Sequence, residues 1–142
     1  MKNRIDDPVF GEMEYAHGWQ KTDQGKVKFC GNEFAVKVVA QAYAGDEVLQ
    51  TQRDSYRAFL EEQDQVLEDH ADVLIDYCES LNNADAPRTK EELCGRLTPT
   101  DVLFLQDGSW GILFDCTWDI EHGVGLFKIK GKWSAGPQDA FL

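Results

Sequence analysis

The sequence has few basic residues, no long apolar run and no closely spaced cysteines. Lys and Arg number 14 against 26 Asp and Glu, which gives a formal net charge of −12 and a pI near 4.5. Nucleic-acid backbones are held by clustered Lys and Arg, so we expect no nucleic-acid partner. The same deficit argues against adsorption to anionic membranes. No segment approaches the roughly 20 apolar residues that span a bilayer, so we expect a soluble protein.

The cysteines and the first residues of the chain favour a reducing compartment. Cys30, Cys78, Cys94 and Cys116 follow one another at intervals of 48, 16 and 22 positions, which match neither a zinc site nor a thioredoxin-type motif. Residues 1–8 contain no apolar stretch, so we expect no signal peptide. We therefore expect a cytoplasmic protein with free, buried thiols, although an even count also permits two disulfides.

Length and composition predict one folded domain over residues 1–142. Hydrophobic residues make up 42% of the chain and aromatic residues 11%, which is enough apolar surface to offset chain entropy. Alternating or continuous apolar runs bounded by turn residues predict a set of strands. These runs are Val9–Tyr15, Lys26–Cys30, Glu33–Tyr43, Asp101–Leu105, Trp110–Trp118 and Gly123–Ile129.

Between these strands, apolar residues recur every three or four positions from Tyr56 to Leu81, which predicts an amphipathic helix over 51–81. A straight helix of that length spans about 46 Å, whereas a domain of this size is roughly 37 Å across. We therefore expect the helix to overhang or to bend, most readily in the polar stretch 61–65. A short second helix is expected to begin at Thr89. Together these patterns predict an α+β fold, with one long amphipathic helix packed on one face of an antiparallel sheet.

Negative charge is concentrated in the predicted helical segment. Residues 51–92 carry twelve acidic and four basic residues. One interpretation is a solvated outer face. The other is a docking surface for a basic partner protein, where complementary charge speeds encounter. The candidate partner-binding residues are Glu61, Glu62, Asp64 and Glu68.

The densest group of reactive side chains lies between residues 115 and 123. Its candidate residues are Asp115, Trp118, Asp119, Glu121, His122 and Gly123. On a strand, Asp115 and Asp119 share one face while Cys116 and Trp118 share the other, so the spacing does not favour a metal site. We expect a structural turn in which Asp119 and His122 form hydrogen bonds and Gly123 adopts a positive φ. The alternative is a metal-dependent or hydrolytic site.

The whole chain resembles a widespread bacterial family of uncharacterised small domains. The resemblance is carried by Phe10-Gly11-Glu12-Met13, by Gln52, Tyr56, Phe59 and Tyr77, and above all by the segment Trp110 to Gly123, with its W-D-x-E-H-G string. Similar small acidic domains occur among bacterial toxin-immunity proteins. The resemblance therefore implies an inhibitor that neutralises a toxin by occluding its site.

These observations favour a non-enzymatic protein-binding module without cofactor or metal. Its expected partner is a basic protein such as a toxin, and the sequence leaves the oligomeric state open. The alternative is a metal-dependent or hydrolytic enzyme that uses the cluster between Asp115 and His122.

Overall fold

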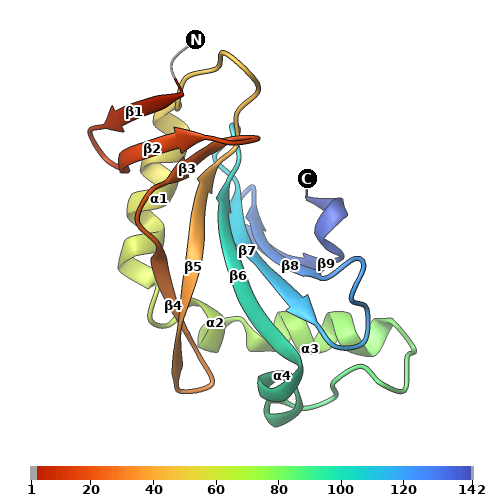
Figure 1. Cartoon of the computed structure of the whole chain (residues 1–142). Helices are drawn as coiled ribbons and strands as arrows, with labels where there is room; N and C mark the ends of the chain where they lie inside the picture. Colours follow the sequence, from red (N-terminus) through yellow and green to blue (C-terminus); the bar gives the residue numbers. More distant parts are fainter. Residues whose placement is uncertain (1–2, 142) are drawn as a thin grey trace.

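The computed structural model describes residues 3–141, and its centre is a nine-stranded mixed sheet (Figure 1). The strands are β1 (Arg4–Asp7), β2 (Gly11–Tyr15), β3 (Trp19–Lys21), β4 (Gly25–Phe29), β5 (Asn32–Ala40), β6 (Leu97–Phe104), β7 (Trp110–Cys116), β8 (Val124–Ile129) and β9 (Lys132–Gly136). Their order is β1-β2-β3-β5-β6-β7-β8-β9, and β4 pairs with the first half of β5.

All helices longer than one 3-10 turn lie in the connection between β5 and β6. They are α1 (Gln50–Glu62), α2 (Val66–Asp69), α3 (Ala71–Ser80) and α4 (Lys90–Arg96). Because the chain crosses over through these helices, β5 and β6 run parallel, whereas every other strand pair is antiparallel. A parallel pair requires such a long crossover. A short 3-10 helix, η1 (Gln138–Ala140), follows β9.

The predicted fold, a long amphipathic helix on an antiparallel sheet, is wrong. The sheet is mixed, and the segment 51–81 folds as three short helices. α1 ends at Glu62, where the Gln65 N–H donates to the Glu62 carbonyl at 2.8 Å and forms a turn. A second break follows at His70, whose φ of −119° and ψ of 17° are not helical.

The breaks let successive helices follow a curved sheet. α1 packs on β6, α2 on β4, and α3 on β9 (Figure 1). At the second break, the His70 ring stacks on Trp133 of β9 at 4.4 Å. The spacing of apolar residues predicts which residues of a helix face the core. It does not predict where the helix must break to follow a curved sheet.

The main core lies between the helices and one face of the sheet. An aromatic group joins the first turn of the chain to α1 and the central strands. Phe10 stacks on Tyr56 at 4.4 Å between ring centres, and Phe59 lies 6.0 Å from Phe104 and 5.7 Å from Trp110. All five rings are at least nine-tenths buried, and burial at this level is the main source of stability.

The opposite face of the sheet is partly covered by the end of the chain. Phe141, which follows η1, stacks on buried Phe127 at 4.5 Å. The Phe127 ring leaves no room for a side chain at Gly111, and the Phe141 ring would crowd a Cβ atom at Gly125. These two glycines therefore let the rings lie directly on the backbone of β7 and β8.

Candidate functional site

The predicted acidic residues lie on the outer side of the helical crossover. Glu61, Glu62, Asp64 and Glu68 are all exposed. The twelve acidic residues of segment 51–92 are likewise all exposed. Within residues 3–141, only Asp54 and Glu68 of these twelve form an ion pair. Most of this charge therefore has no intramolecular partner in the part of the chain that the structure describes.

The negative charge continues along α3. Asp72, Asp76 and Glu79 are spaced four and three residues apart, so they lie on one face of this helix. Between residues 58 and 87 the chain has nine acidic residues and no Lys or Arg. We call the exposed carboxylates of this region the acidic surface: Glu61, Glu62, Asp64, Asp69, Asp72, Asp76 and Glu79.

Glu68 differs from its acidic neighbours because it belongs to a structural contact. Its carboxylate forms an ion pair with Lys90 of α4. The hydrogen bond from Lys90 lowers the pKa of Glu68 and raises the pKa of Lys90, and the backbone of Cys30 also donates to Glu68. Glu68 therefore ties α2 to α4, and we leave it out of the acidic surface.

The expectation of four free thiols is wrong for Cys30 and Cys94, which form a disulfide. Cys30 lies in the turn between β4 and β5, and Cys94 lies on α4. The crossover brings their Cα atoms to 5.7 Å although 64 positions separate them, a pairing that spacing alone does not reveal. Cys78 and Cys116 are free and buried. Burial raises the pKa of Cys78 to about 11 and also raises that of Cys116, so both are unreactive thiols.

The loop between β7 and β8 contains the predicted turn. The Asp119 carboxylate lies 2.8 Å from His122 Nδ1 and accepts from the His122 backbone N–H at 3.3 Å. The Asp119 carbonyl accepts from the Gly123 N–H at 3.0 Å and from the Cys116 thiol at 3.2 Å. The side-chain hydrogen bond with Asp119 raises the pKa of His122. Asp119 thus holds both ends of the loop.

Gly123 ends this loop in a conformation that glycine favours. Its φ is +61°, which confirms the predicted positive φ. A Cβ there would lie 2.7 Å from the Phe114 carbonyl oxygen and would overlap the Gln138 side chain. Gln138 itself donates from Nε2 to the Phe114 carbonyl at 2.8 Å and from its backbone to the His122 carbonyl at 3.2 Å. The end of the chain therefore fixes the loop from one side.

The other predicted residues of this loop do not converge. Asp115 and Glu121 are exposed, and Trp118 is half-buried against the core. Ile120 projects from the tip with 87% of its surface exposed. Among residues 3–141, no three His, Cys, Asp or Glu side chains are placed to hold a metal ion together. The predicted cluster thus contains one hydrogen-bonded side-chain pair, Asp119 and His122, and no convergent site.

A second pair of a carboxylate and a cation lies at the other end of the sheet, where the sequence predicts no site. Asp7 ends β1, and its side chain is 1% exposed. One of its oxygens, Oδ1, accepts from Arg53 Nε and Nη2, both at 2.9 Å. The other, Oδ2, accepts from the backbone N–H groups of Val9 at 3.0 Å and Phe10 at 2.9 Å. Asp7 therefore joins the first turn of the chain to α1.

The Asp7 carboxylate is ionised despite its burial. Burial by itself raises the pKa of Asp7, but the hydrogen bonds from Arg53, Phe10 and Val9 outweigh it. The net result is a pKa below the usual value. A charged carboxylate that is fully hydrogen-bonded is the usual way in which such a group is buried.

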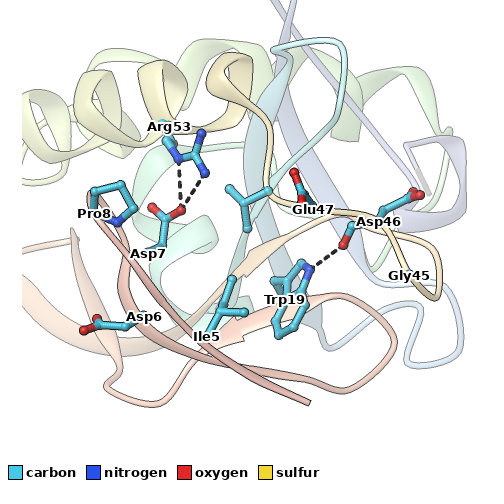
Figure 2. Close-up of a pocket in the computed structure, with 10 residues that line it drawn as sticks. Ile5, Asp6, Asp7, Pro8, Trp19, Gly45, Asp46, Glu47 and Arg53 are labelled. Carbon is cyan, nitrogen blue, oxygen red and sulfur yellow. Dashed lines mark hydrogen bonds and ion pairs between the residues drawn. The ribbon is translucent and has the colours of Figure 1, made fainter. Parts of the chain in front are cut away.

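This pair forms one wall of a cleft of about 400 Å³. Figure 2 shows Asp7 facing Arg53, with Trp19 on the opposite side beside the turn that carries Asp46. Trp19 Nε1 donates to the Asp46 carbonyl at 2.9 Å and so holds this turn in place. The cleft is lined by Ile5, Asp6, Asp7, Pro8, Trp19, Gly45, Asp46, Glu47, Val48 and Arg53.

A buried amide positions the connection from β5 to α1 that carries this turn. Gln52 is fully buried, and its Nε2 donates to the carbonyls of Gln41 at 2.8 Å and Phe104 at 2.9 Å. Its Oε1 accepts from the Leu49 N–H at 2.9 Å. Gln52 thus fixes the start of α1 against the ends of β5 and β6, which explains why a polar residue occupies an inward position of this helix.

Comparison with protein families agrees with the resemblance found in the sequence. The model of a family described as "Domain of unknown function (DUF6985)" matches residues 9–142. The chain belongs to this family. The prediction of an uncharacterised domain family is therefore confirmed. The DUF6985 match covers α1, the acidic surface and the loop between β7 and β8, whereas β1 with Asp7 lies before it.

Neither the curated proteins nor the solved structures include a match to the chain. In residues 3–141, every helix is too short or too polar to cross a membrane. The function of this DUF6985 domain must therefore be inferred from its own side chains.

Proposed function

We propose that the chain is a non-enzymatic protein-binding module that docks a basic partner protein through the acidic surface. The carrying observation is the run of nine acidic residues without Lys or Arg between residues 58 and 87. Its carboxylates point to solvent, and the helices beneath them are held by apolar side chains and by the Glu68–Lys90 contact. The acidic surface is therefore not needed to build the fold.

Uncompensated charge of one sign supports docking for two physical reasons. Like charges on neighbouring turns repel one another and destabilise the helix that carries them. A basic partner relieves that repulsion. The field of such a surface also steers an oppositely charged protein toward it and raises the association rate. A module that must find a basic partner quickly benefits from both effects.

The finer form of the proposal is an immunity-type inhibitor that occludes the site of a bacterial toxin. Two points support this proposal. The domain is small and acidic, and an inhibitor that acts by occlusion needs no catalytic group. A basic nuclease is the kind of toxin that the charge of this chain complements.

The test begins with a partner cross-linked to the tagged chain in the cells that produce it and identified by mass spectrometry. Its affinity is then measured for the unaltered chain and for the triple variant Glu61→Lys, Glu62→Lys, Asp64→Lys. We expect the triple variant to lose binding at low salt. A matched control, Asp23→Lys, Glu33→Lys, Asp115→Lys, changes the net charge equally at exposed positions outside the acidic surface. Equal losses in the two variants would contradict the proposal.

A cytoplasmic location is a separate part of the proposal, and the disulfide makes it testable. The cytoplasm keeps most thiols reduced, so a cytoplasmic protein would hold Cys30 and Cys94 as two neighbouring thiols rather than as the disulfide seen in the structure. Rapid acid quenching of cells, followed by thiol labelling and mass spectrometry, measures this directly. A fully oxidised Cys30–Cys94 pair in quenched cells would instead indicate an oxidising compartment.

A further inference from the structure

We propose that the cleft between β1 and the turn at residues 43–46 accepts a lysine or arginine side chain of the basic partner. This inference rests on the proposed function and names a recognition element for it. The cleft volume of about 400 Å³ lies within the range of small-ligand sites, and it has room for one long side chain. Charge complementarity decides the occupant.

The charge of the cleft is negative after the internal pair is counted. Arg53 is neutralised by the ionised carboxylate of Asp7, which contacts two of its nitrogens. Three further acidic residues line the cleft, Asp6, Asp46 and Glu47, and Figure 2 shows the carboxylates of Asp6 and Asp46 directed away from the space between Trp19 and Arg53. The Asp46 carboxylate accepts from the Tyr43 N–H and from Gln106 Nε2, both at 3.1 Å. Asp6 and Glu47 are exposed and form no ion pair within residues 3–141.

The apolar lining suits the stem of a basic side chain. Ile5, Val48 and Trp19 line the same cleft as these acidic residues, and Val48 and Trp19 are more than nine-tenths buried, so they border it with the edges of their side chains. Lys and Arg bury their methylene stems along apolar surface while the charged group stays near water, and an indole ring adds cation–π attraction. Together these groups can contact both parts of such a side chain.

The rim of the cleft adds a feature typical of protein interfaces. Tyr43 belongs to the turn that carries Asp46, since the Asp46 N–H donates to the Tyr43 carbonyl at 3.0 Å. Its side chain is 71% exposed. Exposed aromatic residues beside a pocket are enriched where protein partners bind. Tyr43 does not line the cleft itself, but it lies in the same turn as Gly45 and Asp46, which do.

The experiment uses blocked tripeptides as probes and the Trp19 indole as the reporter. The full chain labelled with ¹⁵N is titrated with acetyl-Gly-Lys-Gly-amide, and then with the Arg, norleucine and Glu forms of the same peptide. The Trp19 indole N–H signal is assigned from its loss in Trp19→Phe. We expect the Lys and Arg peptides to shift this signal saturably, and the norleucine and Glu peptides to leave it unchanged at the same concentrations.

Three results would overturn the proposal. These are no shift with the Lys and Arg peptides, an equal shift with norleucine, or a larger shift with Glu, which would assign the cleft to an anion bound by Arg53. A matched pair of variants tests the charge. Glu47→Gln should lower the affinity for the Lys peptide about two- to fivefold. Glu33→Gln, at an exposed site outside the cleft, should leave this affinity unchanged. An equal effect of both would also overturn it.

The same experiment separates this inference from the proposed function. The triple Lys variant at residues 61, 62 and 64 leaves the cleft intact, so it should still bind the Lys peptide. If the Lys peptide does not bind while partner binding still depends on the acidic surface, only the assignment of the cleft is contradicted. If the Lys peptide binds but partner binding does not depend on the acidic surface, the proposed function is contradicted and the assignment of the cleft is retained.

Discussion

Two carboxylate–cation pairs, one at each end of the sheet, differ mainly in burial. The Asp7 and Arg53 side chains are 1% and 23% exposed, whereas those of Asp119 and His122 are 41% and 54% exposed. The first pair joins segments 46 positions apart, and the second closes a local turn. The same chemistry therefore serves tertiary structure in one place and local loop geometry in the other.

Burial changes what each pair contributes. When one partner of a buried pair is removed, the other charge is left without compensation, which is strongly destabilising. An exposed pair is screened by water and contributes little. The Asp7–Arg53 contact should therefore control stability, while the β7–β8 loop depends more on its backbone conformation than on its charges.

The largest effect is expected from Asp7→Asn. It should lower the free energy of unfolding by about 3 kcal/mol, because it leaves the Arg53 guanidinium without its charged partner. Urea unfolding at pH 7 measures this loss. Arg53→Met and the double variant complete a cycle that isolates the pair, and the two single losses should not add. A loss below about 1 kcal/mol for Asp7→Asn would place this pair with ordinary exposed ones.

A smaller effect is expected from Gly123→Ala, which tests the backbone of the loop. The positive φ and the close Phe114 carbonyl both oppose a Cβ, so we expect a loss of about 2 kcal/mol in urea unfolding. Gly131→Ala is the matched control, because Gly131 has a φ of +79° with nothing within 4 Å of the added Cβ. It should cost only about 1 kcal/mol. Equal losses at the two glycines would show that crowding at Gly123 is unimportant.

The Asp7 pair should also give the protein part of its acid sensitivity. Because the pKa of Asp7 is lowered in the folded state, its contribution is present above the ordinary carboxylate pKa of about 3.9 and is lost as pH falls through the folded value. The stability difference between the unaltered chain and Asp7→Asn should therefore shrink between pH 5 and the acid limit of folding. A difference that is constant with pH would contradict this assignment.

The smallest effect is expected at the exposed pair. Since Asp119 raises the pKa of His122, the contribution of this pair is present below the unfolded histidine pKa and is lost as pH rises through the folded value. NMR titration of the His122 ring should give a pKa that falls toward about 6.5 in Asp119→Asn. Urea unfolding of His122→Ala should show little change. An unaltered His122 pKa in Asp119→Asn would contradict the assignment of the raised pKa to Asp119.

The contrast between the pairs also explains what the sequence could predict. Local signals worked: alternating or continuous apolar runs bounded by turn residues predicted strands close to β2, β4 and β5, and turn chemistry predicted the positive φ of Gly123. The strands β1 and β3 have only four and three residues, which is at or below the shortest length at which alternation is informative. The continuous helical period hid two changes of direction, because packing against a curved sheet rather than local propensity decides them.

Contacts between distant segments could not be predicted in the same way. Asp7 with Arg53 and Cys30 with Cys94 depend on the crossover that brings α1 and α4 back to the first strands. The one local signal at Asp7 is its place before Pro8, where Asp is a common turn residue. The Gln138 contact to the β7–β8 loop likewise joins residues far apart in the sequence.

The measurement that tests the central claim most directly is the association rate of the identified partner as a function of salt. The Debye length falls from about 30 Å at 0.01 M to about 8 Å at 0.15 M, so steering by the acidic surface should weaken over this range. We predict that the rate constant of the unaltered chain falls about tenfold or more, and that the variant Glu61→Lys, Glu62→Lys, Asp64→Lys is slow at low salt and nearly insensitive to added salt. Equal rates and equal salt dependence in the two proteins would show that the acidic surface does not dock the partner.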